Sequence, residues 1–343
     1  MKRLNPVPLL FLVLSLGGWY FSGLSPGFVA NEVVVRISRD SIMVLALLVP
    51  LAAGMGINFA VTVGAMCAQI GLLAAVILGC SGGSGLGLAL IVSLALSLAL
   101  GWLLGRVLNR VKGQEMIATI IIGFLANGIY QLIFLAGYGR WIPPLNREIM
   151  LSRGVGIRNM VDLPSYRNLM DQVWAINVGS IHLPIFMLLL VALACAAMTY
   201  LFHTRLGRRI EAVGMDKEKS ALLGIDVDAT RIIAIIISTM VACIGQMLFL
   251  QNIGMLNVYT AHLKTDIFSA AALLAGGATI KHAGVRHVLL GVLLFHTLFV
   301  VSPQAGQNLF GNAALGEYFR SFVAYGTIAL ALIVNIRREE RPV

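Results

Sequence analysis

Apolar runs of about 20 residues recur along the whole chain, and each is long enough to cross a bilayer core about 30 Å thick. Of the 343 residues, 59% are apolar and 12% are charged, and the mean hydropathy is +0.89. A soluble domain carries about 25% charged residues. Because lipid offers the backbone no hydrogen-bond partners, the runs should be helical. The sequence therefore predicts an all-α polytopic membrane protein.

A sliding apolar window predicts about ten transmembrane helices in a single membrane domain over residues 1–343. Glycines interrupt the second, third and eighth, so we expect some of the helices to be broken. The predicted spans are 7–24, 41–56, 58–80, 85–105, 116–137, 182–202, 230–250, 266–280, 287–303 and 319–336.

Lysine and arginine concentrate on one side of this topology. They gather in 106–112, 205–219 and 281–286 and at both ends of the chain. Since cytoplasmic loops are enriched in these residues, the pattern predicts cytoplasmic termini and an extracytoplasmic segment 138–181. The net charge of +10 is then a topology signal and does not indicate a nucleic-acid partner.

The extracytoplasmic segment 138–181 opens with a Gly-Tyr-Gly turn and a Pro-Pro pair. We expect Ser165 to cap a short amphipathic helix whose apolar side includes Leu169, Val173 and Trp174. Trp174 would anchor this helix at the membrane surface. The sequence leaves open whether the helix docks an external partner or is an ordinary loop helix.

Two glycine-rich stretches, 52–71 and 270–284, break the helical pattern at membrane depth. Such breaks point to a substrate path in transporters, because irregular backbone is tolerated there only where protein or water satisfies it. The alternative is close helix packing through small residues, as in the pair Gly101 and Gly105. The pathway candidates in these and other spans are Asn58, Thr62, Gln69, Asn127, Gln131, Gln246, Gly276 and Gly277.

Charged residues are missing from the centres of the predicted spans, since Glu115 and Asp266 lie at span ends. Carriers driven by protons or sodium usually hold carboxylates within the membrane, so a secondary carrier is the weaker hypothesis. We expect the path to hydrogen-bond a neutral polar solute.

Residues for catalysis, metal binding and nucleotide binding form no motif. The four cysteines make no Cys-x-x-Cys pair and the histidines are scattered, so no metal site is predicted. The chain also lacks the GxxxxGK[ST] phosphate loop. If ATP drives transport, a separate chain must hydrolyse it.

The cytoplasmic segment 204–228 interrupts the apolar chain with closely spaced charges and two glycines. Leu206, Ile210 and Val213 fall on one stripe of a short helix. We expect Gly214 to end this helix in the left-handed conformation that glycine adopts readily.

A second short helix is predicted to begin at the cap Asp216 and to end at Gly224, and Asp228 is predicted to cap the span that follows. We expect Ala221 and Leu222 to face inward and Lys217 and Lys219 to face outward.

Two partners suit this segment. A basic loop can rest on anionic lipid headgroups. The acidic residues Glu211, Asp216 and Glu218, held in a frame fixed by glycines, favour a groove on a protein partner instead.

The segment resembles the coupling loop of ABC-importer permeases of the monosaccharide and branched-chain amino-acid group. "SAAALLAGGATI", Ser269 to Ile280, is similar to a second segment of that family. The coupling-loop motif is matched at Thr204, Gly207, Arg208, Ile210, Ala212, Gly214, Asp216, Ala221, Gly224, Ile225, Asp226 and Val227.

The resemblance implies a bacterial inner-membrane permease that works as a pair, either two copies or two homologous chains. It implies two cytoplasmic ATPases, which would bind ATP and Mg while this chain binds no cofactor, and an extracytoplasmic solute-binding protein. The residues that would couple to the ATPase are Arg208, Arg209, Glu211, Ala212, Gly214, Asp216, Lys217, Ala221 and Gly224.

The resemblance favours a monosaccharide or a sugar-like compound as the solute. Sugar permeases of the family usually carry an aspartate where this chain has Asn58, and a further glycine pair after Gly277 that is missing here. A nucleoside or an amino acid therefore remains the alternative.

Overall fold

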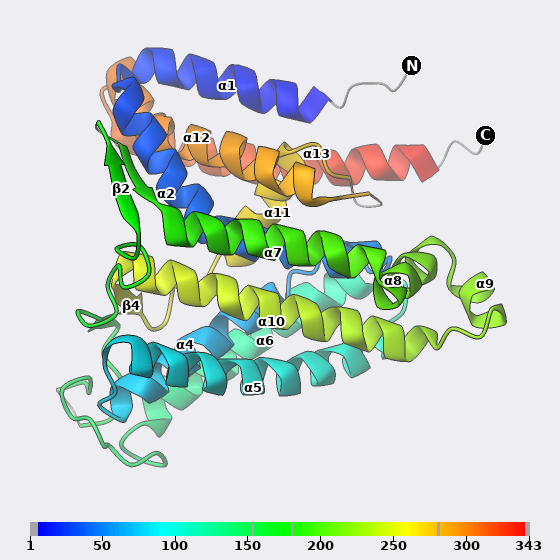
Figure 1. The fold of residues 1–343 in the computed structure, drawn as a ribbon, viewed down its shortest axis with the longest axis horizontal. Coiled ribbons are helices and arrows are strands. Elements are labelled where there is room, and N and C mark those ends of the chain that lie inside the picture. Colours follow the sequence, from blue (N-terminus) through cyan, green and yellow to red (C-terminus); the bar gives the residue numbers. More distant parts are fainter. Residues whose placement is uncertain (1–5, 153, 180, 280–281, 340–343) are drawn as a thin grey trace.

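The computed structural model describes residues 6–152, 154–179, 181–279 and 282–339. Its long helices lie roughly side by side, with α8 and α9 at one end of the bundle and the strands at the other (Figure 1). The helices are α1 (Pro6–Ser22), α2 (Pro26–Leu45), α3 (Leu48–Ala52), α4 (Val61–Ile77), α5 (Gly82–Arg110), α6 (Glu115–Leu132), the π-helical η1 (Ile133–Gly137), α7 (Ile185–His203), α8 (Arg205–Met215), α9 (Lys217–Leu222), α10 (Val227–Ile253), α11 (Thr265–Ala275), α12 (Val285–Phe310) and α13 (Ala313–Glu339). The strands are β1 (Met160–Asp162), β2 (Ala175–Val178), β3 (Ile181–Pro184) and β4 (Met255–Asn257).

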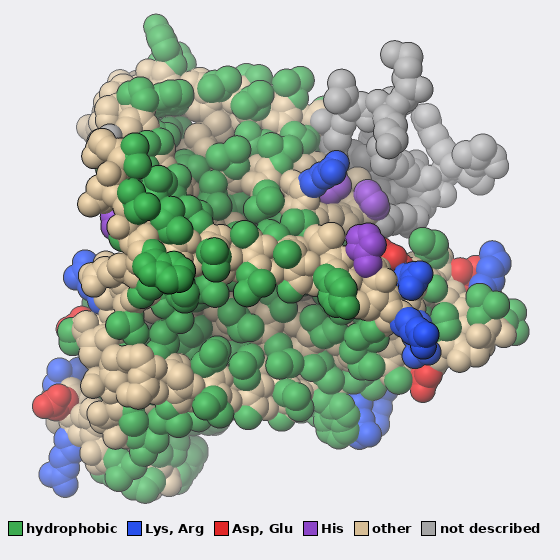
Figure 2. Space-filling view, viewed as in Figure 1, with side chains coloured by type: hydrophobic (Ala, Val, Ile, Leu, Met, Phe, Trp, Pro, Cys, Tyr) green, Lys and Arg blue, Asp and Glu red, His purple; other side chains and the backbone are tan. Residues whose placement is uncertain are grey.

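Five helices within the described residues are long and apolar enough to cross a membrane, namely α5, α6 with η1, α7, α10 and α12. The helices α1, α4 and α11 are apolar but shorter. In Figure 2, apolar side chains cover much of the face between the two ends of the bundle, and charged side chains gather toward the ends. The chain is thus built as a multi-pass membrane protein, although the predicted number of ten spans is not reproduced by length and composition.

The helix α1 begins, and α13 ends, toward the same end of the bundle as α8 and α9 (Figure 1). That both termini are cytoplasmic stays a prediction. Lys281, one of the basic residues behind that prediction, lies outside the described residues.

The helix α2 is one that the hydropathy window misses. Ser25 caps it by accepting a hydrogen bond from the N–H of Phe28 at 3.4 Å, and Pro26 occupies its first position. The predicted span 41–56 is wrong as a single helix, because it joins the end of α2, the short α3 and the loop after it. The window fails because the middle of α2 carries Glu32, Arg36, Arg39 and Asp40.

Close helix packing through glycines is confirmed at the contact of α5 with α10. A methyl group at Gly105 would lie 2.8 Å from the Cα of Ile232, and one at Gly101 would lie 3.0 Å from the Cα of Ile236. These distances are shorter than a side-chain carbon tolerates, so the small residues let the two helix backbones approach each other.

The segment 138–181 contains no helix where one was predicted. Its residues 164–174 form turns, and the backbone of both Asn168 and Trp174 is left-handed, with φ of 53°. The backbone N–H of Asn168 donates to the carbonyl of Gln251 at 2.8 Å, outside its own segment. Contacts with the end of α10 therefore override the local helix signal.

Short antiparallel strands complete this end of the molecule and depart from a purely α-helical class. β1 pairs with β4, with Val161 opposite Leu256, and β2 pairs with β3 as a hairpin before α7. The β1–β4 pair joins segment 138–181 to the loop after α10, so that the two are held together.

Candidate functional site

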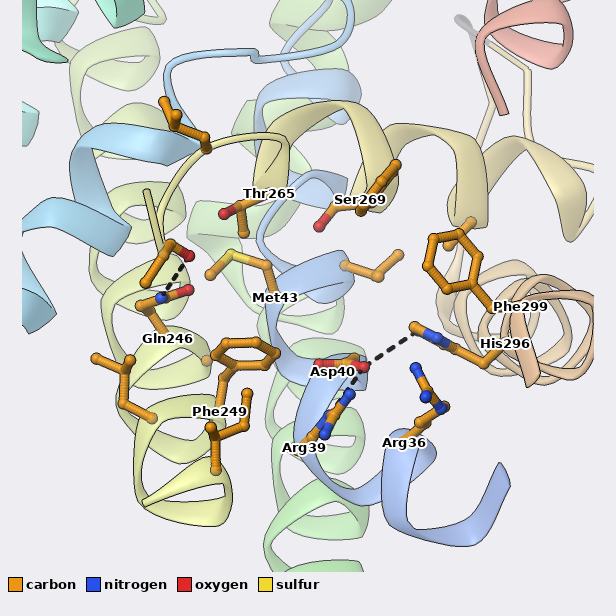
Figure 3. A pocket seen from close by; sticks show the side chains of 18 of the residues that line it. Arg36, Arg39, Asp40, Met43, Gln246, Phe249, Thr265, Ser269, His296 and Phe299 are labelled. Atoms are coloured by element: carbon orange, nitrogen blue, oxygen red, sulfur yellow. Dashed lines mark hydrogen bonds and ion pairs between the residues drawn. The ribbon is translucent and has the colours of Figure 1, made fainter. Parts of the chain in front are cut away.

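A cavity of about 430 Å³ lies among α2, α10, α11 and α12. Gln246 of α10 borders it, 19 residues or about 28 Å along the axis from the start of that helix. Since α9 leads into the start of α10, the cavity lies in the half of the bundle away from α8 and α9. Its polar, charged and aromatic lining includes Arg36, Arg39, Asp40, Gln246, Phe249, Ser269, His296 and Phe299 (Figure 3).

Asp40 is the centre of the charged wall of this cavity. Its Oδ2 accepts from Nε of Arg39 at 3.3 Å and lies 3.3 Å from Nε2 of His296 on α12. The guanidinium of Arg39 also donates to Oδ1 of Asn252 at 3.2 Å and lies 5.1 Å from the centre of the Phe249 ring. Charged groups are costly inside a membrane bundle and usually serve function there.

These charges lie in residues 32–40 of α2, outside the predicted spans, and α2 is not one of the five helices long and apolar enough to cross a membrane. They do not contradict the prediction that the centres of the predicted spans lack charge, but they form a charged wall that the sequence pattern missed. The signals that identify this helix are the cap Ser25 with Pro26, and the i,i+4 pair of Glu32 and Arg36, whose Oε2 and Nη2 lie 3.7 Å apart.

Two of the predicted pathway residues, Gln69 and Asn127, contact His262, a fully buried side chain to which the sequence gave no role. Its Nε2 lies 2.7 Å from Oδ1 of Asn127, and its Nδ1 lies 3.1 Å from the amide of Gln69. Nε2 of Gln131 donates to the same Asn127 oxygen at 3.2 Å. These contacts join α4, α6 and the loop before α11 in one buried polar network.

The remaining pathway candidates lie at separate places. Gln246 borders the cavity and donates from Nε2 to the carbonyl of Ala261 at 3.2 Å. Asn58 is buried in the loop before α4, where its Nδ2 donates to Oγ of Ser238 at 3.3 Å and its Oδ1 accepts from the Ala60 N–H at 3.0 Å. Thr62, the second residue of α4, is buried.

The predicted glycine pair lies at the crossing of α11 and α12. A methyl group at Gly276 would collide with the carbonyl oxygen of His287, and one at Gly291 would collide with that of Ala272. Gly277 has the left-handed φ of 89° that ends α11. Neither residue of the pair borders the cavity, so their visible role is close packing and a turn.

The two short helices α8 and α9 occupy the predicted segment 204–228. Thr204 caps α8 by accepting from the Gly207 N–H at 3.2 Å, and the stripe residues Ile210 and Val213 are buried. Asp216 caps α9 as predicted, and the N–H of Lys219 that donates to its carboxylate at 3.0 Å lowers the pKa of Asp216.

Gly224 lies beyond the end of α9, and its φ of 78° confirms the predicted left-handed turn. Of the residues proposed for coupling, Arg208 and Arg209 are exposed, whereas Glu211 and Ala212 are half-buried.

The predicted left-handed conformation of Gly214 is wrong, because α8 continues to Met215. A methyl group at Gly214 would instead collide with the carbonyl oxygen of Ala52 and lie 3.0 Å from the N of Gly54. Gly54 carries the left-handed φ, at 69°. The glycine in α8 is thus required by the close approach of α8 to the end of α3.

The cap of α10 lies two residues before the predicted one. Oδ1 of Asp226, and not the predicted Asp228, accepts from the N–H of Ala229 at 2.9 Å. Asp228 instead forms a surface ion pair with Lys112, 2.6 Å from its Nζ. Two aspartates two residues apart offer equal local signals, and the turn after α9 selects the first.

The apolar side of α9 points outward, contrary to prediction. Ala221 is exposed, and the side chains at the tip are among the most exposed large apolar groups described, with Met215 at 85%, Leu222 at 87% and Leu223 at 80%. Ser220 is the buried residue of α9. The four-residue surface Met215, Ala221, Leu222 and Leu223 is called the apolar tip below.

Lys217, predicted to face outward, ties α9 to the bundle. Its Nζ lies 3.3 Å from Oε1 of Glu115 at the start of α6, and Nη2 of Arg231 donates to the same oxygen at 2.5 Å. Arg231 of α10 is fully buried. The sequence pattern did not single out Arg231, because it follows the cap of an apolar helix with no partner nearby in the chain.

Within the described ranges, no group of three His, Cys, Asp or Glu residues lies close enough together to hold a metal ion.

The sequence pattern of one protein family, the permease component of branched-chain amino acid transport systems, matches residues 29–332. The match covers α2 through most of α13, and therefore both the cavity and the two short helices. No solved structure matches the chain.

Curated relatives are similar over a part of the chain. The fructose import permease protein FruG of Bifidobacterium longum is 29% identical over 52% of this chain and 48% of its own length. The ribose import permease protein RbsC of Escherichia coli is 28% identical over 42% and 43%, and the branched-chain amino acid permease LivH of Salmonella typhimurium is 25% identical over 41% and 42%. The alignments thus span about half of each relative or less. Through the family match along nearly its whole length, the chain belongs to the permease components of the branched-chain amino acid transport type, the ABC-importer permeases.

Proposed function

We propose that this chain is the transmembrane permease subunit of an ATP-driven, binding-protein-dependent importer of a small polar solute. The observation that carries the proposal is the apolar tip, which exposes four apolar residues at the end of the bundle, in and beside the short helix α9 between Asp216 and Gly224. Exposed apolar clusters ringed by charge mark protein contacts. A cytoplasmic ATPase is the partner proposed for this surface.

The proposed ATPase binds ATP and Mg, and this chain supplies the mechanical connection. The helix α8 rests directly on the end of α3 through Gly214, and Lys217 of α9 pairs with Glu115 of α6. Movement of the two short helices would therefore reach the loop 53–60 and the start of α6 and α10. These contacts support the coupling role of segment 204–228.

The cavity is the proposed solute site. It lies in the half of the bundle away from α8 and α9, so with cytoplasmic coupling helices it faces the outer side of the inner membrane. An extracytoplasmic binding protein would deliver the solute there, and segment 138–181 is the proposed surface for it. Both termini are then cytoplasmic.

A monosaccharide or sugar-like compound is the first candidate solute, and an amino acid or a nucleoside is the second. The names of the relatives include fructose, ribose and branched-chain amino acid permeases, which supports a sugar and an amino acid as candidate solutes. A cavity of about 430 Å³ is within the usual size of small-molecule sites.

The test is a gentle detergent pull-down of the tagged chain from its native membranes. We expect an ATPase at one copy per permease, and loss of that ATPase when Leu222 and Leu223 are both changed to Asp. The matched control is Leu145→Asp, an exposed leucine at 69% in segment 138–181, which should keep the ATPase.

A single permease species in the purified complex would identify a homodimer, and a second species would identify a heterodimer. Recovery of the chain without any ATPase, under conditions that preserve other membrane complexes, would overturn the importer proposal in favour of a secondary carrier.

A further inference from the structure

We infer that the hairpin of β2 and β3 is a membrane anchor whose partner is a lipid surface, at the end of the bundle away from α8 and α9. The hairpin is separate from the cavity and from the apolar tip, so the inference depends neither on the solute nor on the ATPase. Three features of the molecule carry it, namely the two faces of the hairpin, its junction with α7 and the lack of charge along this stretch of the chain.

The hairpin has one apolar face and one polar face. Directly opposite residues of paired strands share a face, and neighbours along a strand alternate between faces. Asn177 lies opposite His182, and its Oδ1 is 2.8 Å from Nδ1 of that histidine, so this pair belongs to the polar face. The apolar hairpin face consists of the pairs on either side, Ile176 with Leu183 and Val178 with Ile181.

The apolar hairpin face is largely uncovered along β2. Ile176 is 53% exposed and Val178 is 58% exposed. Trp174, just before β2, is 67% exposed, and its ring lies edge-to-face with that of Phe186 in the first turn of α7, with 6.1 Å between the ring centres. An apolar face of a sheet has to be buried against something else. This one therefore requires an apolar partner outside the chain.

The junction with α7 places the hairpin at a membrane surface. β3 ends at Pro184, and α7 begins at the next residue, Ile185. The 19 residues of α7 are long and apolar enough to cross a membrane, and their length of about 28 Å matches a bilayer core about 30 Å thick. The hairpin turns away from the axis of α7 toward the start of α2 (Figure 1), where the N–H of His182 donates to Oδ1 of Asn31 at 2.7 Å. It therefore crosses the end of the bundle just beyond the hydrocarbon core.

The stretch of chain that contains the hairpin and α7 carries no Asp, Glu, Lys or Arg from Gln172 to Thr204. Asp171, the last acidic residue before it, is buried. Its carboxylate accepts from the side chains of Gln251 and Asn252 at 2.7 and 3.0 Å. The hairpin thus continues the uncharged stretch of a membrane-spanning helix.

A comparison with the apolar tip favours lipid over a protein as the partner. Four consecutive charged residues, Asp216 to Lys219, lie within the stretch that forms the tip, and apolar patches rimmed by polar residues mark protein contacts. The stretch of the hairpin has no such charges. An amphipathic element with an exposed tryptophan is typical of the membrane–water interface, because its apolar face enters the lipid and its polar face stays in water. Trp174 is thus the anchor of a hairpin, where the sequence predicted the anchor of a helix.

The test measures the fluorescence of Trp174 in the full chain, purified with the partners it retains and reconstituted into vesicles of phosphatidylcholine and phosphatidylglycerol. The difference in emission between the natural chain and Trp174→Phe isolates this residue. One quencher acts from the lipid, as bromine atoms on the acyl chains close to the headgroup. The other acts from water, as iodide on both sides of the vesicle. We expect the emission of Trp174 to lose most of its intensity to the brominated lipid and little to iodide.

Two variants made in the Trp174→Phe chain test whether the apolar hairpin face as a whole lies in lipid. Val178→Trp moves the fluorophore along this face and should be quenched by the brominated lipid. The matched control is Leu145→Trp, at a leucine that is 69% exposed and lies in segment 138–181 outside the hairpin, two residues before Arg147. Its emission should be quenched by iodide and not by the brominated lipid.

Quenching of Trp174 by iodide as strong as in the Leu145→Trp control would place the hairpin in water and overturn the inference. Quenching by neither agent would also overturn it and assign the face to a protein, either a retained partner or a second copy of the chain. Lipid quenching of Trp174 without lipid quenching in Val178→Trp would overturn the role of the apolar hairpin face. The importer proposal is judged separately, because it depends on an ATPase at the opposite end of the bundle.

Discussion

Two charged clusters in this molecule differ in whether a cavity adjoins them. At the start of α9, one oxygen of Glu115 is shared by Arg231 and Lys217, and none of the three lines the cavity of about 430 Å³. Beside that cavity, Arg39 pairs with Asp40 and Arg36 pairs with Glu32. Buried arginine nitrogens without a partner among the described residues occur in both clusters, at Nε and Nη1 of Arg231 and at Nε of Arg36. The first cluster joins helices, and the second borders the proposed solute site.

The difference has an energetic consequence. Removing one member of an enclosed ion pair leaves a buried charge without its partner. Arg36 and Glu32 lie 3.7 Å apart and are partly exposed, so their pair contributes little to folding. The loss of one charge should therefore cost more stability in the first cluster than in the second.

Glu115→Gln should have the largest effect on stability. Arg231 is fully buried and would lose its carboxylate, so we expect a loss of about 3–5 kcal/mol in the free energy of unfolding. Thermal unfolding in detergent measures it. Asp228→Asn, which breaks the exposed pair with Lys112, should cost at most about 1 kcal/mol. Equal effects of the two changes would show that the Glu115 cluster is not an enclosed one.

Gly214→Ala tests whether the end of the bundle that carries α8 and α9 couples to the rest of the chain through close packing as well as through charge. The added methyl group collides with the carbonyl of Ala52, so α8 must move away from α3, at about 1–3 kcal/mol. We expect uptake driven by ATP to fall more than ATPase binding does. Gly17→Ala, at a helical glycine of α1 with open space around it, is the control that should preserve uptake. Normal uptake in Gly214→Ala would contradict the contact between α8 and α3.

Asp40→Asn should have an intermediate effect at the cavity. It removes the charge that faces Arg39 and His296, and we expect a loss of about 1–3 kcal/mol. Asp162→Asn, at an exposed residue of β1, should cost less than about 0.5 kcal/mol. Thermal unfolding without added solute measures both losses in the free energy of unfolding. A loss as small as that of the control would show that Asp40 does not stabilise the charged wall of the cavity.

Arg36→Gln should have the smallest effect on folding, within about 1 kcal/mol, because its pairing with Glu32 is long and partly exposed. The same thermal unfolding experiment without solute measures it. A loss comparable to that of Glu115→Gln would remove the difference between the two clusters and make Arg36 a structural residue.

Local signals near α8 and α9 were sufficient to predict much of that region. Asp216 and Gly224 act through hydrogen bonds and backbone conformations within a few residues, so their positions follow from the sequence. Gly214 shows the limit, because a glycine required by a neighbouring helix looks the same in the sequence as one required by a turn.

The polar residues within the bundle could be predicted only in part. Gln69, Asn127 and Gln131 could be selected as polar groups in apolar spans, but His262, which joins Gln69 to Asn127, could not. His262 lies in a loop between α10 and α11, far along the chain from the helices it contacts. Selection by residue type therefore found the members of the network and not its centre.

By itself, the sequence determined that the chain is a helical multi-pass membrane protein and that two short capped helices lie in segment 204–228, since hydropathy and helix caps are local properties. Only the tertiary structure decided that α2, with its charged middle, packs into the bundle, that Arg36 and His296 border one cavity, and that the apolar side of α9 faces outward. Charge lowers the hydropathy of a segment whether it faces water or a protein partner. The packing of distant helices decides which of the two it meets.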